Sequence, residues 1–178
     1  MAKRSAGTTE RCSPGVLVCQ FKVTLEEIQP PIWRRLVVPA GITLAELHRV
    51  LQVVMGWTDS HMHQFHVGEA RYGNLSPHFG EELDYEDEAK ITLAGVARKA
   101  KTFLYEYDFG DGWMHEIEIE KAQDLEGAMA RAVCADGARA CPPEDIGGPP
   151  GYEDFLAGLA DPKMRIEIEV TARKGTAG

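Results

Sequence analysis

The clearest pattern of hydrophobic positions in the chain is helical and spans "TLAELHRVLQVVMG", residues 43–56. Its apolar residues recur on one face of a helix, at Leu44, Leu47, Val50, Leu51 and Val54. Thr43 is a natural N-cap, and Glu46 follows it at the spacing of a capping box. Gly56 supplies a C-terminal stop. The pattern therefore predicts a helix over residues 43–56, with His48 on or near its polar side.

Alternation of apolar and polar residues predicts strands on both sides of this helix. We expect strands at residues 16–28, over about eight residues after Pro30-Pro31, at 59–68, in a hairpin at 103–120, and at 165–170. Shorter helical patterns predict helices over residues 123–133 and 152–162. Residues 69–90 and 134–151 are predicted to be loops, because the first ends in an acidic run and the second is dense in proline and glycine.

These elements do not alternate as βαβ units, so they predict an α+β fold. We expect a single domain with an antiparallel or mixed β-sheet and a few packed helices. Residues 16–170 form this domain in our interpretation. Residues 1–15 are expected to be a disordered N-terminal arm, and residues 171–178 a frayed C-terminus.

The segment "FLYEYDFGDGWMHEIEIE", residues 103–120, allows two hairpin registers that differ by one residue. A two-residue loop mixes polar and apolar side chains on each face, whereas a three-residue loop, Gly110–Gly112, separates them. Glycine at the end of such a loop also accommodates a left-handed backbone without steric cost. We therefore predict the three-residue loop. It pairs Tyr107 with His115 on the apolar face and leaves Asp108 on the other face.

Composition narrows the class of protein further. The chain of 178 residues is 44% hydrophobic and 26% charged, which is typical of a soluble globular domain. Its apolar segments are shorter than a membrane span. The N-terminal "MAKRSAGTTERCSPG" has basic residues but no apolar region behind them, so we expect no signal peptide, no membrane anchor and a cytoplasmic location. The four cysteines contain no CxxC pair, which argues against a zinc ribbon or a thioredoxin-type motif.

The distribution of charge argues against nucleic-acid binding by the body of the protein. Net charge is −9, yet the first 40 residues carry six basic and three acidic side chains. The acidic excess therefore lies in the remainder of the chain. A phosphate-binding surface requires clustered lysine and arginine. Only the N-terminal arm, or a strip around Arg34 and Arg35, could contact nucleic acid.

Four segments together carry a family resemblance: "PPIWRRLVVP", "GWTDSHMHQF", "FLYEYDFGDGWMHEIEIE" and "CPPEDIGGPPGYEDFLAGLADP". In this order and spacing the chain resembles the plasmid pRiA4b ORF-3-like family over roughly residues 16–163. The resemblance implies an α+β fold and an origin among bacterial and archaeal proteins that are often encoded near plasmids and insertion elements. Some members are described as transposon resolvases. This chain shows neither a catalytic serine surrounded by arginines nor a basic DNA-binding domain, so we do not expect that activity.

His61 and His63 are the strongest metal-ligand candidates. On a strand, the HxH spacing places both imidazoles on one face, as several metal sites require. Further ligands must come from other segments, and the donors that we consider are Asp59, Asp108, Asp111, Glu144 and Asp145. The alternative is that both histidines form hydrogen bonds with backbone groups at a helix–strand junction.

The acidic residues of two loops also have two interpretations. Asp108 and Asp111 are either paired carboxylates for metal-assisted hydrolysis or turn residues that accept backbone hydrogen bonds. Gly147-Gly148 could bring backbone amides close to a ligand, whereas Glu144 and Asp145 argue against an anion and favour bonds to the backbone. A nucleophile elbow, GxSxG, is absent from the sequence.

These observations lead to two hypotheses from different classes of function. The first is a binding or accessory module, associated through the resemblance with mobile elements, and a protein encoded on the same element is a candidate partner. The second is a divalent-metal-dependent hydrolase or nuclease that uses His61, His63 and nearby carboxylates. No cofactor is predicted apart from that divalent metal. The candidate site for both hypotheses comprises His61, His63, Asp108, Asp111, His115, Glu144 and Asp145.

Overall fold

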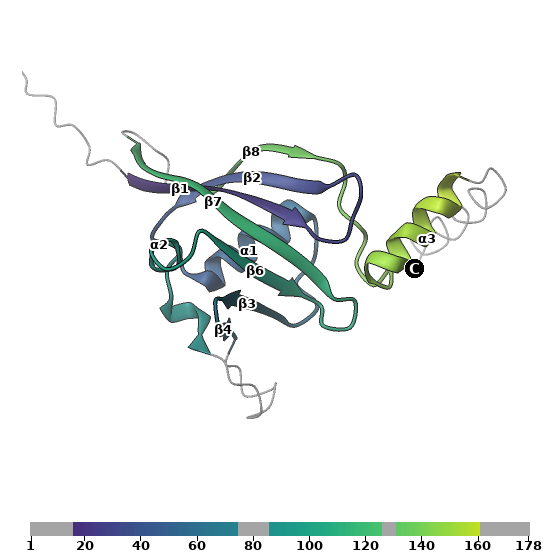
Figure 1. The fold of residues 1–178 in the computed structure, drawn as a ribbon, viewed down its shortest axis with the longest axis horizontal. Coiled ribbons are helices and arrows are strands. Elements are labelled where there is room, and N and C mark those ends of the chain that lie inside the picture. The colour runs from purple at the N-terminus through teal and green to yellow at the C-terminus, as the bar shows by residue number, and fades with distance from the viewer. Residues whose placement is uncertain (1–15, 75–85, 126–130, 161–178) are drawn as a thin grey trace, which may run out of the picture.

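A mixed sheet carries the fold (Figure 1). The computed structural model describes residues 16–74, 86–125 and 131–160. Within these ranges eight strands form one sheet in the order β5-β4-β3-β6-β7-β1-β2-β8. Neighbouring strands are antiparallel, apart from the parallel pair β4 and β5. The predicted α+β fold with a mixed sheet in a single domain is confirmed.

The elements have the following bounds. The strands are β1 (Val16–Leu25), β2 (Ile32–Pro39), β3 (His63–Val67), β4 (Ala70–Gly73), β5 (Glu86–Asp87), β6 (Thr102–Tyr107), β7 (Trp113–Leu125) and β8 (Val133–Ala138). The helices are α1 (Leu44–Met55), α2 (Leu93–Ala97) and α3 (Gly148–Ala160), with a 3-10 turn, η2 (Glu88–Lys90). None of these helices is long and apolar enough to cross a membrane.

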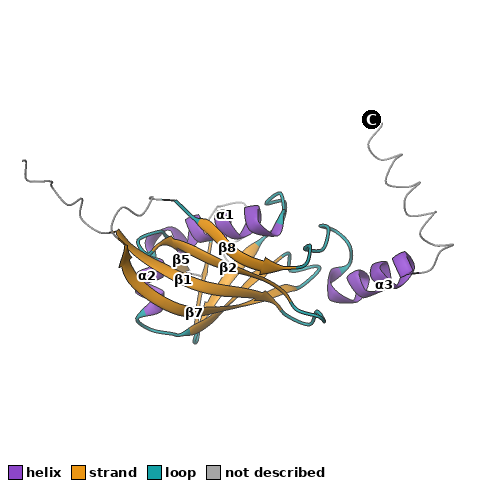
Figure 2. Ribbon diagram, turned by 90° about the horizontal axis from the view of Figure 1, so that it is seen from above, coloured by secondary structure: helices purple, strands orange, loops and turns teal. Residues whose placement is uncertain are grey.

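Helix α1 covers one face of the sheet and confirms the strongest helical pattern in the sequence. Thr43 accepts a hydrogen bond from the backbone N–H of Glu46, and the Glu46 carboxylate accepts one from the Thr43 N–H, which completes the capping box. Gly56 ends the helix in the left-handed conformation, with φ at 80°. The apolar stripe of the helix is buried in the core against the inward residues of β1, β2 and β6. Helix α3 instead projects away from the sheet (Figure 2).

The β6–β7 hairpin has the predicted faces but not the predicted register. Tyr107 pairs with Trp113, and Tyr105 pairs with His115. The loop is therefore 108–112, two residues longer than expected. A shift by two residues keeps every side chain on its own face, because side chains alternate with a period of two. The aromatic side of β6 is accordingly buried, as predicted, through Phe103, Tyr105 and Tyr107.

The longer loop follows from the backbone of Asp108. This residue adopts a positive φ of 54° and leaves the ladder with β7. Its N–H donates instead to the carbonyl of Met62, at 2.9 Å. Its side-chain Oδ1 accepts from the N–H groups of Gly110 and Asp111, at 3.0 and 3.3 Å. Asp108 is thus the turn residue that one interpretation of the sequence proposed.

Strand pairing overrides several weaker local patterns. The helix expected over 123–133 is wrong at its start, because β7 continues to Leu125 and pairs with the first half of β1, and residues 126–130 of it lie outside the described residues. The loop expected over 134–151 contains most of β8, which pairs with β2 as an edge strand, and the start of α3. The loop expected over 69–90 contains β4, β5 and η2. The strand expected over 165–170 lies outside the described residues.

The buried stripe of α1 predicts a large difference between two neighbouring positions. Leu51 is fully buried, whereas Val53 on the same helix is 78% exposed. Leu51→Ala should lower the free energy of unfolding by about 3 kcal/mol, because it removes buried methyl groups and leaves a cavity. Val53→Ala should change it by less than about 0.5 kcal/mol. Urea unfolding followed by circular dichroism measures both, and equal effects would contradict this packing.

Candidate functional site

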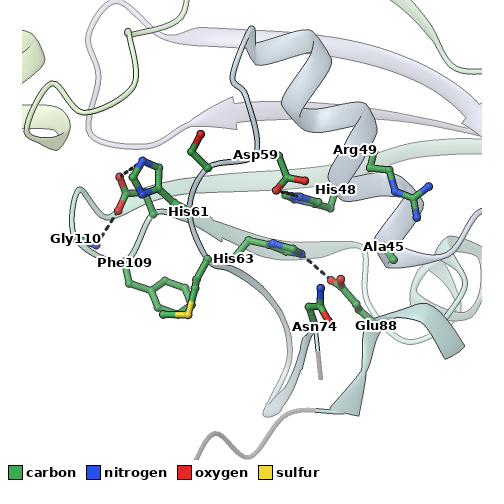
Figure 3. A pocket seen from close by; sticks show the side chains of 13 residues that line it. Ala45, His48, Arg49, Asp59, His61, His63, Asn74, Glu88, Phe109 and Gly110 are labelled. Atoms are coloured by element: carbon green, nitrogen blue, oxygen red, sulfur yellow. Dashed lines mark hydrogen bonds and ion pairs between the residues drawn. The ribbon is translucent and has the colours of Figure 1, made fainter. Parts of the chain in front are cut away.

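A pocket of about 640 Å³ lies where the start of α1, the segment before β3, η2 and the β6–β7 loop meet. Its lining contains three histidines and three carboxylates, which are His48, His61, His63, Asp59, Glu88 and Asp108. Figure 3 shows His48 and His63 side by side, with Asp59 and Glu88 at opposite ends of the pair, and His61 on the side of Gly110. The polar groups therefore form an inner and an outer cluster within one pocket.

The inner cluster is a pair of stacked imidazoles, each held by a carboxylate. The rings of His48 and His63 are parallel within 4°, and their centroids are 3.5 Å apart. His48 Nε2 lies 2.8 Å from Asp59 Oδ1. His63 Nε2 lies 2.9 Å from Glu88 Oε2. The side chains of His48, His63 and Glu88 are more than nine-tenths buried, which orders them strongly.

Hydrogen bonds determine the tautomer of His48. Gln52 accepts from the Asp59 N–H through Oε1, so its Nε2 donates to the Tyr105 hydroxyl at 3.0 Å. The Tyr105 hydroxyl is also 2.8 Å from His48 Nδ1. The Asp59 carboxylate at Nε2 can only accept, whereas the Tyr105 hydroxyl, which accepts from Gln52, still has its own hydrogen to donate to Nδ1. The proton of His48 consequently resides on Nε2 and is donated to Asp59.

The charge state of His48 agrees with this network. Burial lowers the pKa of His48 below its usual value, and the neighbouring His63 lowers it further. Asp59 and Glu88 oppose this shift of the pKa without reversing it. His48 is therefore neutral near pH 7. A neutral ring is also the form that can stack on a second imidazole without charge repulsion.

The outer cluster consists of His61 and Asp108 from the pocket lining, together with Asp145, which lies beside them outside the lining. His61 Nε2 lies 3.0 Å from Asp145 Oδ1 and 3.6 Å from Asp108 Oδ2. Although this nitrogen is buried, it makes no hydrogen bond of acceptable geometry with any described residue. One potential ligand atom from each of the three residues lies within 4.8 Å of the others. His48, Asp59 and His63 meet the same distance criterion.

Several contacts position the loop that carries Asp145. Trp57 Nε1 donates to the carbonyl of Pro142 at 2.9 Å. Glu144 accepts from the Thr58 N–H and hydroxyl through Oε2 and from the Tyr107 hydroxyl through Oε1. The N–H of Gly147 donates to Asp111 Oδ2 at 3.1 Å. Asp145 thus lies between two anchored residues, Glu144 and Gly147, and its φ is positive, at 57°.

The same contacts shift two pKa values. Partial burial raises the pKa of Glu144, but hydrogen bonds from Thr58 and Tyr107 outweigh it, so the net pKa is lowered and Glu144 stays ionised. Burial and the bond to Glu144 raise the pKa of Tyr107, which keeps its hydroxyl protonated. Tyr107 consequently acts as a donor to Glu144 and as an acceptor from the Ser60 N–H, at 2.6 and 3.0 Å.

Gly148 brings the start of α3 against the hairpin loop. A Cβ built at this position would overlap the carbonyl oxygen of Asp111. Its φ of 67° is also one that side chains rarely adopt. The Gly147-Gly148 pair therefore serves a close contact between two loops, and Asp111 and Glu144 anchor those loops. This corresponds to the structural interpretation that the sequence left open.

His115 lies apart from the pocket. Its side chain is completely buried, and Nδ1 lies 3.0 Å from the Trp113 carbonyl and 3.2 Å from the Tyr105 carbonyl. Burial lowers the pKa of His115 to about 4, although the hydrogen bonds to these carbonyls oppose the shift. The predicted position of His115 on the apolar face of the hairpin is confirmed, and the structure does not bring it to the other candidate residues.

The prediction that His61 and His63 share a strand face is wrong. Strand β3 begins at His63, which pairs with Tyr107, so His61 precedes the strand. The two imidazoles belong to different clusters as a result. Asp59, which lies between α1 and His61, also has a positive φ of 58° and is not extended.

Sequence reasoning missed two members of the inner cluster. His48 was placed on or near the polar side of its helix, but it is only 4% exposed. Its spacing of four residues from Gln52 was the available signal, because it places both side chains on one helical face. Glu88 lies at the end of an acidic run that was expected to be solvated, yet it is also 4% exposed. Nothing in the local pattern distinguishes it from its acidic neighbours.

These features define a class: a single-domain α+β protein with a pocket of histidines and carboxylates beside a mixed sheet. The sequence profile of the plasmid pRiA4b ORF-3-like protein family matches residues 17–173. The chain belongs to this family.

Two relatives place the chain within known sequences and structures. An uncharacterized protein, y4hQ, from Sinorhizobium fredii (strain NBRC 101917 / NGR234) is 42% identical over 157 residues, which cover 85% of this chain and 78% of the relative. The crystal structure of a protein of unknown function, MM3350, from Methanosarcina mazei Go1 is similar, with a TM-score of 0.74 and 34% identity. It covers 83% of this chain and 84% of that chain.

The buried His115 predicts a specific dependence of stability on pH. Its pKa is about 4 in the folded chain, against 6.5 for an ordinary histidine. Between these values the unfolded chain binds a proton that the folded chain does not. Stability due to this group is therefore complete above pH 6.5 and falls by about 1.4 kcal/mol per pH unit as the pH drops towards 4.

His115→Gln should remove this contribution while it retains a side-chain donor for the carbonyls. Urea unfolding of both proteins between pH 7 and 4.5 measures the effect, and the slope of the variant should be shallower by about one proton. Other carboxylates and His48 titrate equally in the two proteins and cancel in the difference. Parallel pH profiles would show that His115 does not titrate as its burial requires.

Proposed function

We propose that this protein is a binding module whose pocket takes a cation, and that it is a cytoplasmic accessory protein of mobile elements. The observation that carries the proposal is the pairing of every pocket histidine with a carboxylate. His48 is paired with Asp59, His63 with Glu88, and His61 with both Asp108 and Asp145. Arg49 is the basic residue in the lining apart from the histidines.

Fold stability is a poor explanation for the inner cluster. Buried ionisable groups lose their hydration, and replacing them with apolar side chains of similar size is often neutral or stabilising. Here His48, His63 and Glu88 are buried together at the inner end of a pocket. Such an expensive arrangement next to a cavity is typical of a recognition site.

The size and charge of the pocket favour a small positively charged ligand. Its volume of about 640 Å³ falls within the range of ligand sites in proteins. Three carboxylates line it against the single arginine Arg49, so it attracts positive charge. The plasmid in the family's description supports the accessory role. We propose that the partner is a protein encoded on the same element.

The proposal predicts cation binding that depends on the pocket carboxylates. Isothermal titration should detect saturable, one-to-one binding of at least one member of a panel that contains Zn²⁺, Mn²⁺, Mg²⁺, arginine methyl ester and spermidine. The triple variant Asp59→Asn, Glu88→Gln, Asp108→Asn should lose this binding, because it removes the pocket charges but keeps side-chain size.

A control variant separates this effect from the loss of net charge. Glu116→Gln, Glu118→Gln, Glu153→Gln removes the same number of charges outside the pocket lining. It should bind as the wild-type protein does. If the wild-type protein binds no member of the panel, or if the pocket variant and the control variant lose binding equally, the proposed function is overturned.

A divalent-metal-dependent hydrolase or nuclease is the second candidate. The observation that favours it is a histidine positioned by a buried carboxylate beside a second cluster of potential metal ligands. If His63 donates its Nε2 proton to Glu88, its Nδ1 carries the lone pair that a general base requires.

This candidate predicts hydrolysis of a phosphodiester. The protein with added Mn²⁺ should cleave bis(4-nitrophenyl) phosphate faster than Mn²⁺ alone, and His63→Gln should reduce the rate at least tenfold. His66→Gln is the control, since His66 belongs to the same strand but does not line the pocket. Absorbance of released nitrophenolate measures the rate. A wild-type rate equal to that of Mn²⁺ alone would exclude this activity towards phosphodiesters.

A further inference from the structure

The two clusters of the pocket differ in whether their nitrogen atoms are already bonded. In the inner cluster both ring nitrogens of His48 have partners, Tyr105 and Asp59. His63 Nε2 is hydrogen-bonded to Glu88. In the outer cluster His61 Nε2 is buried but lacks a hydrogen bond of acceptable geometry among the described residues. The nitrogen lies at ion-pair distance from Asp145 and Asp108 but makes no hydrogen bond, so a ligand would gain more here than at a nitrogen that is already bonded.

The separations in the outer cluster match those around a metal ion. Imidazole nitrogen and carboxylate oxygen bind first-row divalent metals at about 2.0 to 2.2 Å. Neighbouring ligand atoms around such an ion are consequently about 3.0 Å apart in octahedral geometry and about 3.4 Å apart in tetrahedral geometry. His61 Nε2 lies 3.0 Å from Asp145 Oδ1 and 3.6 Å from Asp108 Oδ2.

Contacts other than those with His61 hold the Asp108 carboxylate and the backbone that carries Asp145. Asp108 uses Oδ1 to accept from the N–H groups of Gly110 and Asp111, which leaves Oδ2 directed at the imidazole. Asp145 follows Glu144, which accepts three hydrogen bonds from Thr58 and Tyr107. Preorganised donors of this kind lower the entropic cost of binding an ion.

We propose that His61, Asp108 and Asp145 bind one divalent transition-metal ion of the Zn²⁺ and Mn²⁺ class. The ligand atoms are His61 Nε2 and one carboxylate oxygen from each aspartate, a mixture that suits these ions. This inference rests on the proposed cation-binding function and assigns it to the outer cluster.

Metal binding would also join segments that are distant in sequence. His61 precedes β3, Asp108 follows β6, and Asp145 lies in the loop before α3. The ion would therefore tie the start of α3 to the sheet, next to the contact between Gly147 and Asp111.

Titration with Zn²⁺ alone, followed by calorimetry, tests the site. Co²⁺ alone gives a second readout, through the visible absorption of the bound ion. We expect one ion per wild-type chain and at least a tenfold increase in Kd for each of His61→Ala, Asp108→Asn and Asp145→Asn. Asparagine tolerates the positive φ of Asp108 and Asp145, so these variants should fold, which circular dichroism verifies.

Two control variants test whether loss of Zn²⁺ binding is specific to the outer cluster. Glu118→Gln changes a carboxylate of β7, and His66→Gln changes a histidine of β3, and neither side chain lines the pocket. Both should bind Zn²⁺ with a Kd within threefold of the wild-type value. Loss of binding in His63→Gln together with retention in His61→Ala would place the ion in the inner cluster and overturn this inference.

The remaining outcomes separate this inference from the proposed function. Binding of arginine methyl ester or spermidine without binding of Zn²⁺ or Co²⁺ would refute the metal site but leave a cation-binding module. Binding of no cation at all would refute both. If all three outer-cluster variants retain Zn²⁺ binding, the assignment of the ion to these residues is refuted, but the cation-binding function is not.

Discussion

The pocket depends on two tyrosine hydroxyls that point from the same face of β6. Alternation along the strand buries both Tyr105 and Tyr107, and each hydroxyl must then find a partner inside the protein. Tyr105 contacts His48 and thereby orders the inner cluster. Tyr107 connects the Ser60 N–H to Glu144 and thereby places the loop that carries the outer cluster. The core residues that hold the sheet together consequently also position the polar groups of the pocket.

The two clusters divide the work of a binding site between them. The inner cluster is a buried network in which His48 is neutral and both of its ring nitrogens have hydrogen-bond partners. Such a network gives the pocket a rigid inner end. The outer cluster leaves His61 Nε2 without a hydrogen bond among the described residues, close to two carboxylates on separate loops. We therefore assign a structural role to the inner cluster. We assign ligand binding to the outer cluster, where a ligand would gain the most binding free energy.

Much of the fold was accessible from local patterns. The limits and both caps of α1 followed from its periodicity, Thr43, Glu46 and Gly56, because these signals involve contacts within one or two turns. The faces of the hairpin followed from alternation. Its loop length did not, because Asp108 donates its N–H to Met62, a residue far away in the sequence. The helix expected over 123–133 was wrong at its start for a similar reason, since pairing with β1 is a long-range contact.

The sequence by itself determined the family, the α+β class and the residue types of the pocket, including His61, Asp108 and Asp145 as candidates. Only the tertiary structure decided which of these residues meet. It separated His61 from His63, placed His115 in the core, and added His48 and Glu88 to the pocket. The physical reason is that periodicity specifies the face on which a side chain lies, whereas its neighbours across that face depend on how distant segments pair and pack.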